Sequence, residues 1–234
     1  MRRMILIALL LASGIAGMAQ VVTKEKALAS GVMDAMGGYE KFQQTRYLQW
    51  DFFGYRTLTW DKWNKQVRID YPDGSLTIIT RLDRLEGRVY RNGEPVTDKD
   101  SLNSYLEKGQ RMWMNDSYWL VMPFKLFDPG VQLSYVGKGK DMNGNEAEMI
   151  EMTFQEVGAT PENRYVIYID QGTYLITQWD YYVKYWEEEP ELSCTWSGYE
   201  WYNGLRFASE RSGFGNLSNI KVLSTVPEST FSRL

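Results

Sequence analysis

Apolar and polar residues alternate over much of the chain. Leu48, Trp50 and Phe52, for example, alternate with Gln49 and Asp51. In the first half, runs with this period occupy residues 48–52, 58–61, 67–71 and 76–78. A period of two places alternate side chains on one face of a β-strand. The pattern therefore predicts a series of strands, each with one buried face.

Residue pairs that favour tight turns separate these runs. Asparagine, aspartate and glycine tolerate the positive φ that hairpin turns demand. Glycine-containing pairs of this kind lie at 73–74, 92–93, 143–144, 171–172 and 203–204. In the second half they border apolar runs at 150–154, 165–169, 174–185, 192–202 and 205–211. The spacing predicts an antiparallel meander of ten or eleven strands.

Other segments have helical spacing instead. Apolar residues recur every three or four positions over 23–36, where Thr23 is a candidate N-cap and a glycine pair follows as a stop signal. A short helical turn is expected over 39–43. From 100 to 127 the alternation stops and the apolar residues return to helical spacing. We expect a helical insertion at about 100–127 that splits the meander.

These elements together predict the fold class. It is mainly β with α, built on a large curved antiparallel sheet, an unclosed half-barrel, with helices covering the concave face. No linker, low-complexity tract or shift in composition divides the chain. Residues 20–234 are therefore expected to form a single domain that contains the insertion.

Residues 1–19 have the layout of a secretory signal peptide. Arg2 and Arg3 precede an apolar run over 4–12, and small residues lead up to Ala19. This run is shorter than the roughly 20 residues that span a membrane. We expect cleavage after Ala19 and export to the periplasm as a soluble protein. A lipoprotein signal would place a cysteine after the small residues, but the only cysteine is Cys194.

Composition and charge narrow the chemistry. The 234 residues include no histidine, which removes the Ser-His-Asp and Cys-His nucleophile systems and histidine-ligated zinc. Without Arg2 and Arg3, 24 basic residues stand against 30 acidic ones, a net charge of −6. This charge disfavours nucleic acid and anionic membrane surfaces as partners. The apolar alternation around Cys194 predicts a buried core residue rather than a reactive thiol.

The order of elements resembles the lipoprotein-carrier fold, the unclosed half-barrel of the LolA and LolB proteins and of the sensor RseB. The residues at 115–126, NDSYWLVMPFKL, and those at 128–130 and 133–137 are also similar to an uncharacterised family of exported bacterial proteins assigned to that fold. The likeness to that family covers nearly the whole mature chain. It implies the fold and a cavity for an apolar ligand. No residue of this chain takes a role from a carrier, because no carrier motif matches residue by residue.

The residues themselves point to a similar site. Ligand sites are mostly concave, apolar and rich in aromatic residues, and the inward positions of this sheet are unusually large. Methionines on the insertion could line a surface that accepts varied acyl chains. The candidate ligand-binding residues are Trp50, Phe52, Trp60, Tyr71, Met112, Trp113, Trp119, Met122, Phe154, Trp179, Tyr181 and Trp196. For each of them a place in a filled core is the alternative.

Acidic residues offer the main chemistry that needs no histidine. Paired carboxylates hydrolyse glycosides, and the available acids are Asp51, Asp61, Asp70, Glu151 and Asp180. All five fall on the polar side of the alternation, where we expect a solvated surface. The acidic run at 187–191 is likewise expected to form an exposed hairpin tip rather than a calcium site.

The hypothesis that these observations favour is a non-catalytic periplasmic binder or carrier. Its ligand would be apolar, a lipid, an acyl chain or a lipidated protein, held between the sheet and the helical insertion. We expect no catalysis, no cofactor, no metal and a monomeric chain. Two alternatives stay open: a carbohydrate-binding or glycoside-hydrolysing protein, and an envelope interaction or sensor module with an envelope protein as partner.

Overall fold

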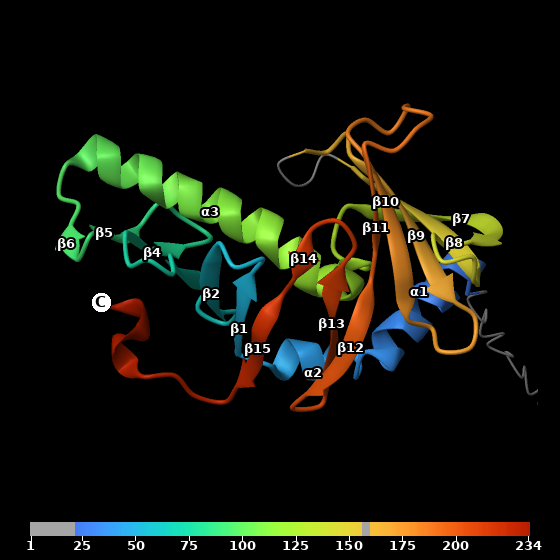
Figure 1. Ribbon diagram of the computed structural model, residues 1–234, viewed down its shortest axis with the longest axis horizontal. Helices are drawn as coiled ribbons and strands as arrows, with labels where there is room; N and C mark the ends of the chain where they lie inside the picture. Colours follow the sequence, from blue (N-terminus) through green and yellow to red (C-terminus); the bar gives the residue numbers. More distant parts are fainter. Residues whose placement is uncertain (1–21, 156–159) are drawn as a thin grey trace, which may run out of the picture.

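The computed structural model describes residues 22–155 and 160–234. Strands dominate the described part of the chain, and the helices are few (Figure 1). The helices are α1 (Lys24–Ala35), α2 (Tyr39–Gln44), α3 (Lys99–Val121), and the short 3-10 helices η1 (Met122–Lys125) and η2 (Glu228–Phe231). The predicted signal peptide at 1–19 lies outside the described residues.

The first sheet has seven strands. They are β1 (Tyr47–Phe52), β2 (Arg56–Asp61), β3 (Gln66–Asp70), β4 (Leu76–Arg81), β5 (Gly87–Arg91), β6 (Glu94–Pro95) and β15 (Ser218–Leu223). Their order is β15-β1-β2-β3-β4-β5-β6, with antiparallel neighbours throughout. The apolar positions of the predicted runs face the core, where Trp50, Leu58 and Ile69 have no exposed surface.

Two further sheets complete the array. The five-stranded sheet has the order β11-β10-β9-β8-β7, and the three-stranded sheet has the order β12-β13-β14. Their strands are β7 (Val131–Lys140), β8 (Glu146–Phe154), β9 (Arg164–Asp170), β10 (Ile176–Tyr182), β11 (Leu192–Thr195), β12 (Ser197–Tyr202), β13 (Leu205–Arg211) and β14 (Gly215–Asn216).

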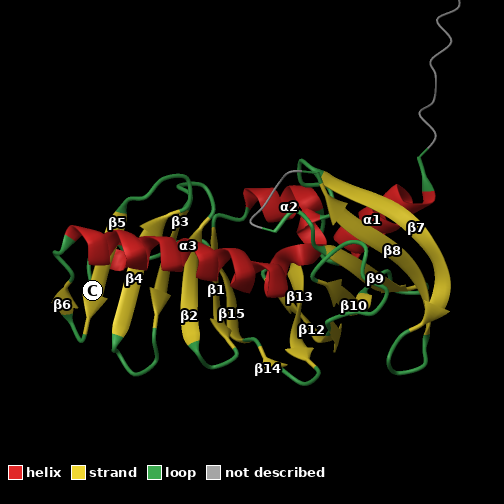
Figure 2. Cartoon of the chain, turned by 90° about the horizontal axis from the view of Figure 1, so that it is seen from above, coloured by secondary structure: helices red, strands yellow, loops and turns green. Residues whose placement is uncertain are grey.

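The small sheet connects the two large ones. On one side the Leu217 amide donates to the Ser209 carbonyl at 2.8 Å. On the other side the Thr195 amide donates to the Ser212 hydroxyl at 3.1 Å. The three sheets thus follow one another as an open array, with β6 at one end and β7 at the other (Figure 2).

Helix α3 lies across the seven-stranded sheet and extends toward the three-stranded one (Figures 1 and 2). Gly109 allows the close approach, because a Cβ there would come within 2.7 Å of Ile78 on β4. Farther along, Trp113 on the helix packs edge-on against Trp60 on β2, with ring centroids 5.1 Å apart. The helix therefore packs on the first sheet, and one side of its second half faces the five-stranded sheet.

The fold class predicted from the sequence is confirmed, since the protein is mainly β with antiparallel sheets that do not close. The helices expected over 23–36, 39–43 and 100–127 are also confirmed as α1, α2 and α3 with η1. The hydrogen bonding, however, divides the strands among three sheets. The described residues contain fifteen strands rather than ten or eleven, and two of these, β6 and β14, have only two residues each.

Two predicted strands end earlier than expected. The run at 192–202 forms two strands, because the chain changes partner from β10 to β13 at Trp196 and Gly198 adopts a left-handed φ of 65°. The run at 174–185 yields β10, which ends at Tyr182. A turn follows in which the Lys184 amide donates to the Glu187 carboxylate at 3.1 Å.

The prediction that all five acids lie on a solvated surface is wrong for two of them. Asp61 is 1% exposed, because Arg46 and the amides of the β2–β3 turn close over its carboxylate. Asp180 is 6% exposed and accepts hydrogen bonds from Tyr168 and Gln178. In both cases polar neighbours satisfy the carboxylate, which allows it to be buried.

Other surface and core predictions hold. Cys194 is fully buried, and burial raises the pKa of its thiol. At the acidic tip, Glu188, Glu189 and Glu191 are exposed, as expected for a hairpin end. Among the described residues, no helix combines the length and the apolar character that a membrane crossing requires.

Candidate functional site

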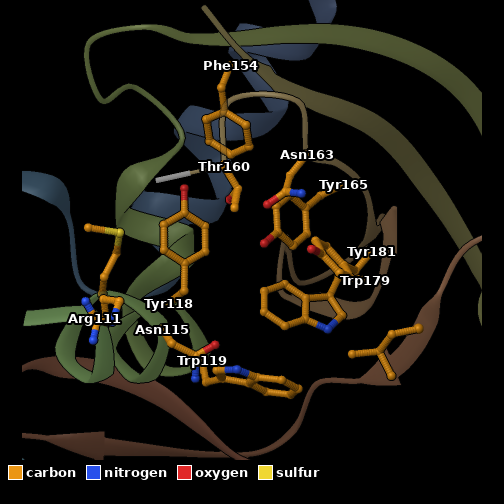
Figure 3. A pocket seen from close by; sticks show the side chains of 12 residues that line it. Arg111, Asn115, Tyr118, Trp119, Phe154, Thr160, Asn163, Tyr165, Trp179 and Tyr181 are labelled. Carbon is orange, nitrogen blue, oxygen red and sulfur yellow. The ribbon is translucent and has the colours of Figure 1, made fainter. Parts of the chain in front are cut away.

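A partly open cavity of about 520 Å³ lies between the second half of α3 and the five-stranded sheet (Figure 3). Cavities of roughly 300–1,000 Å³ are typical of sites for small molecules. The described residues that line it are Arg111, Met114, Asn115, Tyr118, Trp119, Phe154, Thr160, Asn163, Tyr165, Trp179, Tyr181 and Leu192.

One stripe of α3 forms the helical wall. Arg111, Met114, Asn115, Tyr118 and Trp119 are spaced by three or four residues and therefore share one side of the helix. The buried side of the helix, which includes Asp116 and Leu120, packs into the core. The same helix thus contributes one face to the core and another to the cavity.

The opposite wall consists of inward side chains of β8 to β11. Tyr165 on β9 lies directly opposite Tyr181 on β10, and Tyr181 in turn lies opposite Leu192 on β11. Two positions before Tyr181 on the same strand face, Trp179 extends this surface toward the helix. Phe154, at the end of β8, closes the row on the other side.

Aromatic rings meet across the cavity from both walls. The ring centroids of four neighbours lie within 6.1 Å of the Tyr165 centroid. One of them is Tyr118 of α3, at 6.0 Å with an angle of 27° between the ring planes. Trp119 of α3 meets Trp179 of β10 edge-on at 5.0 Å. Such contacts add about 0.5–1.5 kcal/mol each to the burial of the rings. The walls are therefore held at a fixed separation by their own side chains.

Uncharged polar groups supply hydrogen-bonding capacity inside this aromatic surface. Asn163 donates from its amide nitrogen to the Val183 carbonyl at 2.8 Å, and Figure 3 shows its amide oxygen on the cavity side. Burial raises the pKa of Tyr118 and of Tyr165. Both phenols therefore stay neutral near physiological pH and keep an O–H that can donate to a ligand.

Among the described residues that line the cavity, one side chain carries a charge. Arg111 is the single ionisable cation among the described lining residues, and none of these residues is aspartate or glutamate. The arrangement suits a molecule that is largely apolar, with polar atoms at its edge. General acid–base chemistry would need a titrating acid or base near neutrality, which the described lining does not provide.

The structure brings four of the predicted site residues together at this cavity: Trp119, Phe154, Trp179 and Tyr181. Two more lie directly behind it. Trp196 packs edge-on against Trp179 with centroids 5.3 Å apart, and Phe52 meets Trp119 at 6.5 Å. Both of these rings are buried, so they support the cavity wall instead of forming its surface.

The remaining six candidates belong to the packing between α3, η1 and the first sheet. Trp50 and Met122 have no exposed surface. Met112 and Tyr71 are half-buried against the core cluster. Trp60 and Trp113 pack against each other rather than around an open space. In the structure these six residues therefore pack in a filled core, which was the alternative for each candidate.

Sequence reasoning missed several lining residues, notably Tyr165, Asn163, Arg111 and Leu192. A signal for Arg111 was present, because it falls on the helical stripe of Tyr118 and Trp119. Tyr165 begins a predicted strand and alternates with Ile167, which also marks it as inward. Asn163 carried no comparable signal, because its position depends on how the chain enters β9.

Comparisons with known proteins give a limited result. No protein-family model matches the chain, and no curated protein sequence matches it. Similar solved structures include a DUF1329 family protein from Desulfovibrio piger ATCC 29098, with 14% identity and a TM-score of 0.45 over 88% of this chain and 96% of that one. They also include MucB in complex with MucA(peri), with 12% identity and a TM-score of 0.26 over 90% of this chain and 60% of that one. Membership of the family suggested by residues 115–126 stays a prediction.

Proposed function

We propose that this protein is a non-catalytic binder or carrier that holds one apolar or amphiphilic molecule, such as a lipid or an acyl chain, in the cavity between α3 and the five-stranded sheet. The observation that carries the proposal is the aromatic lining of a cavity of about 520 Å³. Burial of apolar surface in such a site contributes roughly 25 cal/mol per Å². Contact with rings from both walls would therefore supply most of the affinity.

The size of the cavity limits the ligand. A space of about 520 Å³ is in the range for one drug-sized molecule. It suits a single chain or ring system better than the several acyl chains of a lipidated protein. A lipidated partner would therefore place only part of its lipid here, with the rest outside the cavity.

The proposed location is the periplasm. It rests on the signal-peptide pattern of residues 1–19, with Gln20 as the first residue of the mature chain. A binder in that compartment would exchange its ligand with an envelope protein or a membrane. N-terminal sequencing of the exported protein tests this, because a mature chain that retains residues 2–12 would contradict it.

The carbohydrate alternative receives less support at this cavity. Rings such as Trp119 and Tyr165 could stack on a sugar, and Asn163 could bond to its hydroxyls. Hydrolysis, however, needs two carboxyl groups about 5 to 10 Å apart across the bond that breaks. The described lining residues supply none. We therefore treat sugar binding as an outcome of the binding experiment and do not propose hydrolysis.

Probe binding tests the proposed function. The purified protein, prepared without detergent, is titrated with a fluorescent fatty-acid probe and analysed by native mass spectrometry. We expect micromolar binding, about −8 kcal/mol. Met114 is 40% exposed at the cavity, and Met114→Trp would fill part of the space. This variant should weaken binding about tenfold, which is about 1.4 kcal/mol.

A matched variant controls for the added ring. Met142 is 54% exposed and does not line the cavity, so Met142→Trp should leave the affinity unchanged. Equal binding by the parent and Met114→Trp would place the probe elsewhere. Absence of probe binding by the parent, together with binding on a glycan array, would replace the lipid proposal with the carbohydrate alternative.

A further inference from the structure

The chemical character of the ligand's polar end follows from Arg111. This residue lies on the cavity stripe of α3, one turn before Asn115 and two turns before Tyr118. Figure 3 shows it on α3 at one side of the cavity. Its side chain is 67% exposed, so the guanidinium is at the mouth and not among the buried rings.

The existing partner of Arg111 is weak. Glu107, one turn earlier on α3, lies 3.6 Å from the guanidinium, and both side chains are more than half exposed. Exposed ion pairs contribute only about 0–1 kcal/mol. A guanidinium also presents several N–H donors in a fork that fits a carboxylate or phosphate group in two-point fashion. An incoming anion could therefore displace Glu107 at low cost.

We propose that the cavity selects single-chain amphiphiles with an anionic head group, a carboxylate or a phosphate, and that Arg111 is the residue that determines this selectivity. The inference rests on the proposed function. The chain of the ligand lies among Trp179, Tyr165 and Tyr118, and its head lies at the mouth beside Arg111. Neutral amphiphiles bind the same apolar surface but lack the ionic contact.

Three probes with the same chain separate the two contributions: tetradecanoate, tetradecyl phosphate and 1-tetradecanol. Binding is measured by the change in intrinsic tryptophan fluorescence, which Trp119 and Trp179 report from the cavity wall. We expect both anionic probes to bind about tenfold more tightly than the alcohol, as for a charge-assisted hydrogen bond at a partly exposed site. Raising the salt concentration should reduce this preference.

Variants assign the preference to one residue. Arg111→Gln should abolish the preference for the anions and change the affinity for the alcohol by less than about twofold, because it removes the charge and leaves the apolar wall. Glu107→Gln should strengthen binding of the anions about two- to threefold through loss of the competing carboxylate. Arg91→Gln, an exposed arginine on β5 away from the cavity, should change neither.

Each result has one meaning. A preference that persists in Arg111→Gln, or equal binding of the alcohol and the anions by the parent, would overturn the role of Arg111 while leaving the proposed function intact. Absence of binding for all three probes would overturn both. Because Arg111 is exposed, the variant should fold, and circular dichroism verifies this before the titrations.

Discussion

The guanidinium of Arg56 on β2 donates two hydrogen bonds to the carboxylate of Asp116 on α3, at 2.6 and 2.7 Å. The carboxylate has no exposed surface, and Arg56 is 15% exposed. Asn115, which lines the cavity, also donates to this carboxylate at 3.0 Å. The pair therefore holds α3 on the first sheet at the same turn of the helix where Asn115, on another side, lines the cavity.

Removal of one member of this pair should destabilise the protein strongly. Asp116→Leu leaves the Arg56 charge largely buried without its partner, which typically costs about 3–5 kcal/mol. Urea denaturation measures the loss. The double variant Arg56→Met, Asp116→Leu should recover much of it, because both charges are then absent. A double variant as unstable as the single one would show that the effect comes from packing rather than from the ion pair.

Most strands of the two large sheets were predictable because apolar and polar residues alternate along them, but the sequence predicted one sheet where the structure has three. The period-two runs of β1 to β4 are unambiguous, and glycine turns mark their ends. The break after Trp196 was not predicted, although the apolar positions shift there from even numbers to odd ones across Gly198, where the chain exchanges one partner strand for another. Hydrogen-bond partners are a tertiary property, and the local pattern does not encode them.

The cavity was predictable only in part, for a similar reason. A large inward aromatic residue looks the same in sequence whether a helix packs on it or a space adjoins it. Trp60 and Trp179 both alternate correctly, yet Trp113 covers the first while the second borders the cavity. The difference lies in where α3 rests, and this depends on the Arg56–Asp116 pair and on Gly109.

The contact at Gly109 gives a second prediction. Alanine is favoured over glycine within a helix by about 1 kcal/mol, so Gly109→Ala would stabilise an isolated helix. Here the new Cβ would come within 2.7 Å of Ile78 and 3.1 Å of Thr80. Overpacking of this kind costs about 1–3 kcal/mol. We expect a net loss of stability by thermal denaturation.

Gly31 on α1 provides the matched helical control. A Cβ there would meet the ring of Tyr174, which is 43% exposed and can move outward. Gly31→Ala should therefore be less destabilising than Gly109→Ala. If the two substitutions had equal effects, the close seating of α3 on β4 would not be the cause.

The buried Lys62 should make the free energy of unfolding depend on pH. Burial, together with the nearby Lys125, lowers the pKa of Lys62 to about 7. Its ammonium lies 3.4 Å from the centroid of the Phe42 ring. In the unfolded chain the same group titrates near 10.4. Between these values the unfolded chain binds the additional proton, so stability should rise from pH 7 toward pH 9 and should not change with this group below about pH 6.

The variant Lys62→Met isolates this contribution. The chain has no histidine to titrate in the same range, although the raised pKa values of Cys194 and of several tyrosines oppose the trend at the alkaline end. The free energy of unfolding of the parent, relative to that of the variant, should therefore increase as the pH rises from 7 to 9. A constant difference would mean that Lys62 titrates normally in the folded protein.

Arg211 links the core to the cavity and gives the last prediction. It is 2% exposed, donates to the Trp119 carbonyl in the final turn of α3 at 2.5 Å, and stacks on Trp196 with 3.7 Å between the guanidinium carbon and the ring centroid. A cation at this place satisfies a carbonyl at the negative end of the helix. Through these contacts it positions Trp119 directly, and Trp179 by way of Trp196.

Arg211→Lys keeps the charge but loses the planar stacking and the forked donors. We expect it to lower stability by about 1–3 kcal/mol and to weaken binding of the fatty-acid probe about threefold or more under conditions where it is folded, although Arg211 does not line the cavity. Arg206→Lys is the control, because Arg206 lies over the rings of Tyr199 and Trp201 instead. A folded Arg211→Lys protein with the parent's probe affinity would show that the cavity wall holds its geometry without this arginine.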